Sequence, residues 1–116
     1  MSFEIKSELK WNGSIAMKDF DIANNLALEE SAILVEGKAA EKVQVDSGDL
    51  KRSITRSKII DKIKIFVGTI LEYAPFVEFG TRFSKAFPFL SPAYLTSISA
   101  IKAIFKKRYK AVKYVD

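Results

Sequence analysis

The segment that most constrains this chain is Glu72 to Phe83, EYAPFVEFGTRF, where a single carboxylate, Glu78, stands between Val77 and Phe79. Seven of its twelve residues, Pro75 included, are apolar. Burying an unpaired carboxylate is costly, so the fold must leave Glu78 in water, pair it, or use it in chemistry. Any structure proposed for this chain has to solve that problem.

The composition excludes several classes of site. The 116 residues fit one domain, 1–116, and a 48% apolar content with nine Phe argues against disorder. The chain has no Cys and no His, which removes disulfides, thiolate nucleophiles, histidine bases and ordinary zinc sites. We expect folding in the cytosol, without a secretory signal or a membrane span, because no stretch approaches about 18 uninterrupted apolar residues.

The first part of the chain predicts a strand followed by a long helix. Apolar and charged residues alternate over 2–11, which indicates a strand with one buried face. Asn12-Gly13 breaks this pattern, and Ser14 is placed to cap a helix over 15–44. The helix was assigned from apolar and small residues at helical spacing: Phe20, Ala23, Leu26, Ala27, Ile33, Leu34, Gly37 and Ala40.

The middle of the chain predicts a turn and a hairpin. VDSGDL at 45–50 has the composition of a turn, with Ser47, Gly48 and Leu50 as its marker residues. The β-branched runs 50–59 and 62–70 then favour an antiparallel hairpin, and alternation is cleaner in the second run.

The last third predicts an irregular aromatic region and a second helix. Pro75 and Pro88 bracket the aromatic region, which has at most one helical turn over 75–79. Ser91 as cap and Pro92 in the first turn predict a helix to about 113. The whole order predicts an α+β fold, a small antiparallel sheet with two long helices packed against it.

Glu78 is better interpreted as structural than as catalytic. A hydrolase would need a second carboxylate about 5–9 Å away, and nothing fixes Glu72, Asp46 or Asp49 there. We therefore predict no catalytic, cofactor-binding or metal-binding residue. Glu78 can instead accept N–H groups and the Thr81 hydroxyl in the turn EFGT, or pair with an arginine. The predicted structural clamp consists of Glu78, Gly80, Thr81 and Arg52, with Arg82 as an alternative partner.

Two surfaces are candidates for contact with a partner. The Phe-rich stretch 76–89 either packs into the chain's own core or docks on another subunit, through Phe76, Phe79, Phe83, Phe87 and Phe89. Residues 102–113 hold six Lys/Arg and no acid, within a net charge of +5. The resulting basic face could bind phosphate groups or simply be solvated, and consists of Lys102, Lys106, Lys107, Arg108, Lys110 and Lys113.

Three segments follow one another along the chain: DSGDLKRSI at 46–54, YAPFVEFGT at 73–81 and PFLSPAY at 88–94. Together they resemble the HK97 gene-product-ten-like family of phage tail components. They match the family patterns T/S-G-x-L-x-x-S-I, Y-A-x-x-x-E-x-G-T and P-F-L-x-P-A. The stretch between Thr81 and Pro88 is shorter than in many relatives, which reduces any contact made there. The matching residues are Gly48, Leu50, Ser53, Ile54, Tyr73, Ala74, Glu78, Gly80, Thr81, Pro88, Phe89, Pro92 and Ala93.

This resemblance implies a virion structural protein of a tailed phage or prophage, without enzymatic activity or cofactor. It would belong to the neck, as a tail-completion or head–tail joining subunit in a homo-oligomeric, often hexameric, ring around the DNA channel. Its partners would be other neck and tail proteins, with non-specific contact to phage DNA as a further option. It would occupy the host cytoplasm before assembly and the virion afterwards. The alternatives are a small basic nucleic-acid-binding protein and a hydrolase that uses Glu78 with a nearby Asp.

Overall fold

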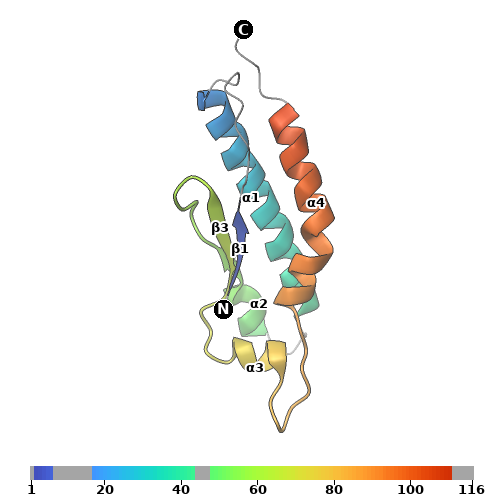
Figure 1. Cartoon of the computed structure of the whole chain (residues 1–116). Coiled ribbons are helices and arrows are strands. Elements are labelled where there is room, and N and C mark those ends of the chain that lie inside the picture. Colours follow the sequence, from blue (N-terminus) through green and yellow to red (C-terminus); the bar gives the residue numbers. More distant parts are fainter. Residues whose placement is uncertain (1, 7–16, 44–47, 111–116) are drawn as a thin grey trace.

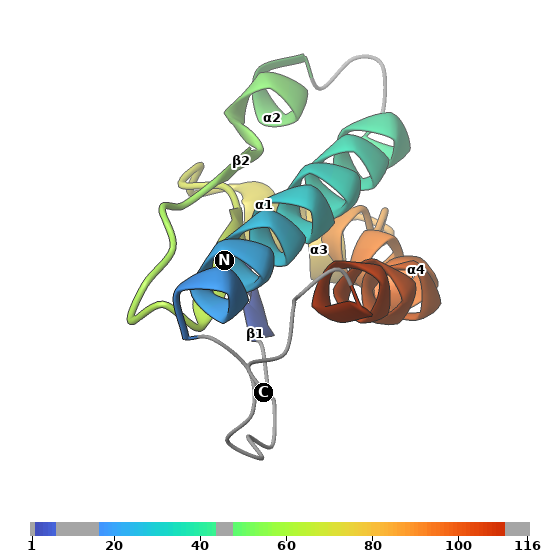
Figure 2. The same cartoon turned by 90° about the horizontal axis from the view of Figure 1, so that it is seen from above.

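The structure is a computed structural model that describes residues 2–6, 17–43 and 48–110. Helices α1 and α4 run antiparallel along the molecule, the sheet lies beside α1, and α3 with the loop after it forms one end (Figures 1 and 2). The predicted α+β class is confirmed. In chain order the elements are β1 (Ser2–Lys6), α1 (Met17–Lys42), α2 (Gly48–Ser53), β2 (Thr55–Arg56), β3 (Lys64–Gly68), α3 (Ala74–Phe79) and α4 (Leu90–Lys110).

The sheet has the strand order β1-β3-β2, and both pairings are antiparallel. The strand predicted near the N-terminus is present as β1, where Ile5 is buried and its neighbours Glu4 and Lys6 are exposed. This alternation follows from the two-residue period of a strand. The positions 7–11 of the predicted strand, with Asn12, Gly13 and Ser14, lie outside the described residues.

The predicted hairpin exists, but its first strand is much shorter than expected. The strand β2 consists only of Thr55–Arg56, and α2 occupies most of the first half of the run 50–59. Beyond β2, the Ser57 N–H donates to the Phe66 carbonyl at 2.8 Å, and Ile60 forms an isolated bridge with Lys64. A strand would place Arg52 on the buried face with Leu50 and Ile54, whereas the helix lets Leu50 and Ile54 enter the core and leaves Arg52 exposed. The Ser53 hydroxyl donates to the Leu50 carbonyl at 2.7 Å, which closes the helical turn. Alternation was therefore the wrong period for this segment.

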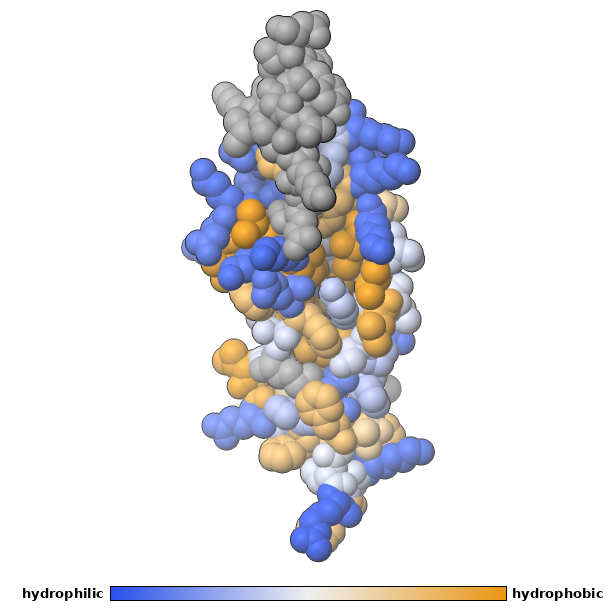
Figure 3. Space-filling model, viewed as in Figure 1, coloured by the Kyte–Doolittle hydropathy of each residue, from blue (hydrophilic) through white to orange (hydrophobic). Residues whose placement is uncertain are grey.

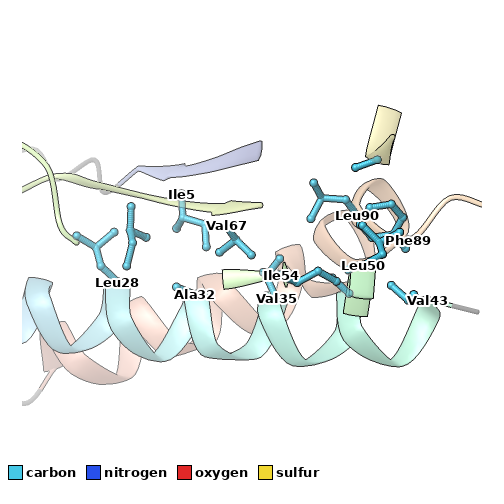
Figure 4. Close-up of a cluster of buried hydrophobic side chains, with 14 residues drawn as sticks. Ile5, Leu28, Ala32, Val35, Val43, Leu50, Ile54, Val67, Phe89 and Leu90 are labelled. Carbon is cyan, nitrogen blue, oxygen red and sulfur yellow. The ribbon is translucent and has the colours of Figure 1, made fainter. Parts of the chain in front are cut away.

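The core lies between α1 and the sheet, with α2 and the start of α4 closing one end (Figure 4). One face of α1 contributes Leu28, Ala32, Val35 and Ala39, all fully buried. Burying a side chain of the size of Leu28 stabilises the fold by about 1.5–3 kcal/mol. The remaining core residues include Ile5, Val43, Leu50, Ile54, Ile65, Val67, Ala74, Phe89, Leu90 and Ala93.

The apolar residues from which the sequence assigned α1 do not all face the core. Ala23 and Ala27 are buried, but Leu26 and Ile33 are about half exposed and Gly37 is exposed as well. Helix α1 is apolar on two sides, so helical spacing alone could not identify the side that packs on the sheet. The exposed side is available for another contact.

Polar contacts connect α1 to the elements around it. The buried amide of Asn24 donates to the Lys62 carbonyl and accepts from the Tyr109 hydroxyl, both at 2.8 Å. Arg56 binds Glu36 at 3.0 Å and Glu29 at 3.2 Å. The hydrogen bond to Glu36, and after it the one to Glu29, raise the pKa of Arg56 above its ordinary value. Arg56 is therefore charged at every pH at which the protein is folded, and it attaches the edge strand β2 to α1.

Helix α4 begins at Leu90, two residues before Pro92, which would be its first residue with Ser91 as the cap. Ser91 therefore lies within the first turn and is not the cap, whereas Pro92 occupies the first turn as expected. Stacked rings attach α4 to its neighbours, Phe3 with Tyr94 at 5.0 Å and Phe20 with Tyr109 at 5.5 Å between centroids. Within the described ranges, no helix is long and apolar enough to cross a bilayer.

Candidate functional site

Helix α3 has reversed polarity, with its acid inside and its phenylalanines outside. The predicted helical turn over 75–79 is present, and Ala74 and Glu78, four positions apart, share its buried face. Only 3% of the Glu78 surface is exposed, whereas Phe76 and Phe79 point to solvent. The apolar character of this segment therefore serves the surface and not the core.

The Glu78 carboxylate binds the first turn of α4. Its Oε1 accepts the N–H of Leu90 at 2.8 Å and of Phe89 at 3.3 Å, and its Oε2 accepts the N–H of Ser91 at 3.4 Å. The first N–H groups of a helix have no partner within the helix, and the helix dipole favours a negative charge there. Glu78 thus provides the cap of α4 from twelve residues upstream.

The partners of Glu78 differ from those that the sequence indicated. The Thr81 hydroxyl accepts the N–H groups of Phe83 and Ser84 at 3.1 and 3.0 Å, and it is not bound to Glu78. Arg52 pairs with Asp49 in its own short helix. The other arginine considered, Arg82, lies over the Phe83 ring at 5.2 Å. The Thr81 hydroxyl, Arg52 and Arg82 thus each contact a residue close to them in the sequence, and none of the three is bound to Glu78.

Gly80 allows the chain to turn sharply after α3. Its φ is +76°, and a Cβ atom would stand 2.8 Å from the Ala86 nitrogen and 3.0 Å from the Ser84 carbonyl oxygen. Contacts this short with backbone atoms require glycine at this position. The Gly80 N–H donates to the Phe76 carbonyl at 2.8 Å and closes the end of α3.

Backbone hydrogen bonds close the loop 80–88 on itself. The Thr81 N–H donates to the Ser84 carbonyl at 2.9 Å, and the Phe87 N–H donates to the Val77 carbonyl at 2.8 Å. With the Glu78 contacts to α4, both ends of the loop are attached to helices. The loop is therefore held in a defined conformation by its backbone and the Thr81 hydroxyl, without any contribution from its phenylalanine rings.

The phenylalanines of this region separate into two groups. Phe89 is fully buried in the core, so the prediction that it contacts a partner is wrong. It directly precedes α4, where the Glu78 contacts hold the backbone against the core. The other four are exposed, Phe76 by 60%, Phe79 by 71%, Phe83 by 88% and Phe87 by 44%. We call these four, together with the exposed Arg82 and Lys85, the aromatic loop surface.

This surface occupies the end of the molecule formed by α3 and the loop. Apolar side chains gather there in Figure 3, with hydrophilic side chains at the tip. A hollow of about 260 Å³ opens among Tyr73, Phe76, Val77, Thr81, Ser84, Lys85 and Phe87. A contiguous apolar surface with a hollow in it is typical of a protein–protein contact.

The basic face of α4 is only partly as expected. Lys102, Lys106, Lys107 and Lys110 are exposed. Arg108 binds Glu30 of α1 at 3.0 Å, so it connects the two long helices and does not belong to the face. Lys113 lies outside the described residues. We therefore define the basic face of α4 as Lys102, Lys106, Lys107 and Lys110.

The predicted turn residues contribute to the fold and not to an exposed site. Gly48 begins α2, and Leu50 is fully buried beneath it. Ser47 lies outside the described residues. The segment VDSGDL therefore leads directly into a helix that covers one end of the core.

The geometry at Glu78 suits binding of N–H groups and leaves little room for hydrolysis. Both carboxylate oxygens are occupied by backbone donors, and the residue is removed from water. Asp49, one of the acids considered as its partner, is exposed and paired with Arg52, while Asp46 lies outside the described residues. Over 2–6, 17–43 and 48–110, no group of three or more His, Cys, Asp or Glu residues is placed to hold a metal ion.

Two features that the sequence analysis did not identify nevertheless had a trace in the sequence. Phe89 directly precedes α4 and has no side chain able to cap it, and Ser91 lies one position inside the helix. The buried acid twelve residues before the helix was the available substitute. The second apolar side of α1 was also visible, as the row of Leu26, Ile33 and Gly37 that was assigned to the core.

A family model described as "Bacteriophage HK97-gp10, putative tail-component" matches residues 13–80, more than half of the chain. The match includes α1, the sheet strands β2 and β3, and α3 with Glu78 and Gly80. Neither a curated protein nor a solved structure matches the chain.

Proposed function

Because the chain belongs to the HK97-gp10-like family of bacteriophage tail components, we propose that it is the tail-completion or head–tail joining subunit of the virion neck. In this function it forms a homo-oligomeric ring, with six copies as the expected number, and contacts other neck and tail proteins. The observation that carries the proposal is the aromatic loop surface, four exposed phenylalanines on α3 and on the loop after it, whose backbone is closed by hydrogen bonds.

The exposed phenylalanines favour a function in assembly. Burying one phenylalanine ring removes about 150–250 Å² of mostly apolar surface from water. A free monomer that leaves several such rings exposed forgoes this stabilisation. Exposed apolar surface of this extent is typical of a protein that is later covered by a partner. A structural protein of a particle has such partners on several sides.

The rigid attachment of the loop supports the same function. Association is weakened by the entropy lost when flexible segments become ordered at an interface. Here the Glu78 carboxylate and the Gly80 turn fix the loop before any partner arrives. The phenylalanines can therefore bind at a small ordering cost.

The basic face would act in the assembled ring. The four lysines of one copy provide few phosphate contacts and weak, salt-dependent binding. Repeated around a ring, the same lysines would form a positive collar facing the DNA channel or an acidic neighbour.

A free nucleic-acid-binding protein is the second candidate, and the basic face is the observation that favours it. Such a protein would bind duplex DNA tightly as a monomer or dimer. The loss of Arg108 to an ion pair with Glu30 weakens this candidate, because it removes the cation best suited to bidentate recognition. No side chain that reads bases is placed among the four lysines, so we expect no sequence preference.

The purified chain is expected to be a monomer or a weak oligomer that closes into a ring only at the tail end. A ring that closed early in the host cytoplasm would compete with assembly on the particle. Light scattering over about 10–100 μM protein tests this, because association by mass action depends on concentration. A dimer that persists on dilution would contradict this expectation.

Deletion of the gene in the phage or prophage that encodes the chain tests the proposed function. We expect full heads and separate tails that do not join, visible by electron microscopy, and restoration by the chain supplied in trans. Normal infectious particles without the chain would overturn the proposal. So would particles that lack tails altogether, because these would assign the chain to tail formation.

A further inference from the structure

The outer side of α1 carries an apolar stripe that nothing in the described structure covers. Ile22, Leu26 and Ile33 are exposed by 50%, 45% and 53%. Their spacings of four and seven residues place them on one side of the helix. The stripe extends over eleven residues, or about 16 Å along the helix axis. We call these three residues the outer stripe of α1.

The outer stripe and the aromatic loop surface differ in charge. Helix α1 contains six acids and three lysines. Glu29 and Glu36 lie beside the stripe on the same side of the helix, and they share Arg56 as their partner, which leaves one net negative charge there. From Phe79 to Lys110 the chain contains seven Lys/Arg and no acid. Of these seven, Arg82 and Lys85 stand exposed among the phenylalanines. The two apolar surfaces therefore have complementary surroundings.

We infer that the aromatic loop surface of one copy docks on the outer stripe of α1 of the next copy. The inference rests on the proposed ring and names the contact that would build it. Phenylalanines of the loop would pack on Leu26 and its neighbours, and Arg82 and Lys85 would approach the acids of α1. The hollow beside Phe87 is large enough, at about 260 Å³, for a branched aliphatic side chain.

The contact must form between copies, because the two surfaces cannot meet within one chain. The loop lies beyond the end of α1 at which Lys42 stands, while the stripe lies along the helix (Figure 1). A contact between unlike surfaces of identical subunits runs head to tail, and it closes into a ring when the rotation permits. Pairing of two loops with each other would instead bring Arg82 and Lys85 against their own copies, which is unfavourable.

The size of the two surfaces suits such a contact. The exposed parts of the four phenylalanines provide roughly 400–500 Å² of apolar surface. A standard interface buries about 800 Å² on each partner, of which somewhat more than half is apolar. The loop therefore supplies about the apolar core that one such interface needs.

Cross-linking of a double variant, Leu26→Cys with Phe83→Cys, tests the inference. The chain contains no other cysteine, so a short bismaleimide can react only at these two positions, and peptide mapping separates the mixed product from links between like positions. Both side chains are exposed, so the fold should tolerate the changes, which circular dichroism would verify. Head-to-tail docking should give a ladder of dimers, trimers and larger species, even when the free association is weak.

The matched control replaces Leu26→Cys by Leu95→Cys, another exposed leucine on a long helix but outside both surfaces. The ladder should be lost in this control, and also when Arg82→Glu and Lys85→Glu are added to the test variant. Dimers from Phe83→Cys alone, without a mixed product, would overturn the inference in favour of loop–loop pairing. The inference would also be overturned if the test and control variants gave equal amounts of cross-linked product, or if neither gave any. Failure of the proposed function would appear separately, in the gene deletion.

Discussion

The core beside α1 and the base of the aromatic loop both exclude water, but they do so by different means. Beside α1, Leu28, Val35 and their neighbours are held by non-directional apolar packing. Beneath the loop, one carboxylate accepts three backbone N–H groups. Apolar packing tolerates exchanges of similar volume, whereas the carboxylate has no substitute of the same shape and charge. Stability should therefore depend on side-chain volume in the core beside α1, and on the charge and acceptor atoms of residue 78 at the base of the loop.

The largest loss of stability is expected from Leu28→Ala in the core. The substitution leaves a cavity in a fully buried site and should cost about 2–5 kcal/mol of the free energy of unfolding. Chemical denaturation of the two proteins would measure it. Leu95→Ala, at an exposed leucine, should change the free energy by less than about 0.5 kcal/mol and serves as the control. Equal effects at both sites would contradict the assigned core.

Glu78→Ala should cost about 2–3 kcal/mol, because the N–H groups of Phe89, Leu90 and Ser91 lose a charged acceptor. Glu78→Gln should cost less, because its amide oxygen can still accept the N–H groups of Phe89 and Leu90, while the negative charge and the contact with Ser91 are lost. Glu41→Ala, at an exposed acid of α1, is the control. A Glu78→Ala protein that melts with the wild type, its backbone unmoved, would refute the capping contact.

Gly80→Ala should cost about 1–3 kcal/mol, because alanine at φ +76° meets backbone atoms closer than real Cβ contacts allow. Gly37→Ala is a matched control with the opposite sign. Gly37 is exposed within α1 with nothing within 4 Å of an added Cβ, so alanine should stabilise the helix by about 0.5–1 kcal/mol. If both substitutions shifted the melting temperature in the same direction, the requirement for glycine after α3 would be wrong.

Phe83→Ser should leave the free energy of unfolding within about 0.5 kcal/mol of wild type, because the ring is 88% exposed. Its effect should appear in assembly, as a loss of joined particles when the variant complements a gene deletion. The buried Phe89 provides the contrast, since Phe89→Ser should unfold the protein before assembly is reached. Full complementation by Phe83→Ser would separate the aromatic loop surface from the proposed function.

The smallest effect on stability is expected from exchanging Lys102, Lys106, Lys107 and Lys110 for glutamate. All four are exposed, so the change should act on contacts of the assembled ring and not on the fold. A titration of the wild-type monomer against random and phage-derived duplexes at about 150 mM salt should show weak binding without preference. Tight binding to one sequence would favour the nucleic-acid-binding candidate.

The sequence predicted those elements in which the apolar residues all face the core of this chain. The alternation around Ile5 and the β-branched run at Ile65 were sufficient for β1 and β3, and the spacing around Pro92 was sufficient for α4. The sequence failed where two periods competed, as at Leu50 and Ile54, or where both sides of a helix are apolar, as at Ile33. Which side of α1 meets the sheet is decided by tertiary packing, which no local pattern contains.

The candidate site was predictable in its residues but not in its connections. Glu78 stood out because an acid between Val77 and Phe79 needs donors. Its donors are backbone N–H groups of residues 89–91. Almost every residue has such a group, so the sequence does not indicate which of them bind Glu78. The exposure of Phe83 and the burial of Phe89 depend on the same connection, so they could not be separated beforehand.

The pairing of β1 with β3 has a consequence for synthesis on the ribosome. Ser2 pairs with Gly68 and Lys6 with Lys64, so the first strand made must wait for residues roughly 60 positions later. At bacterial elongation rates this delay is on the order of 3–12 seconds. During that time β1 is an unpaired strand, and its exposed Glu4 and Lys6 are the kind of charges that discourage pairing with other nascent chains. The alternating charges at the N-terminus thus protect the chain before they form part of a sheet.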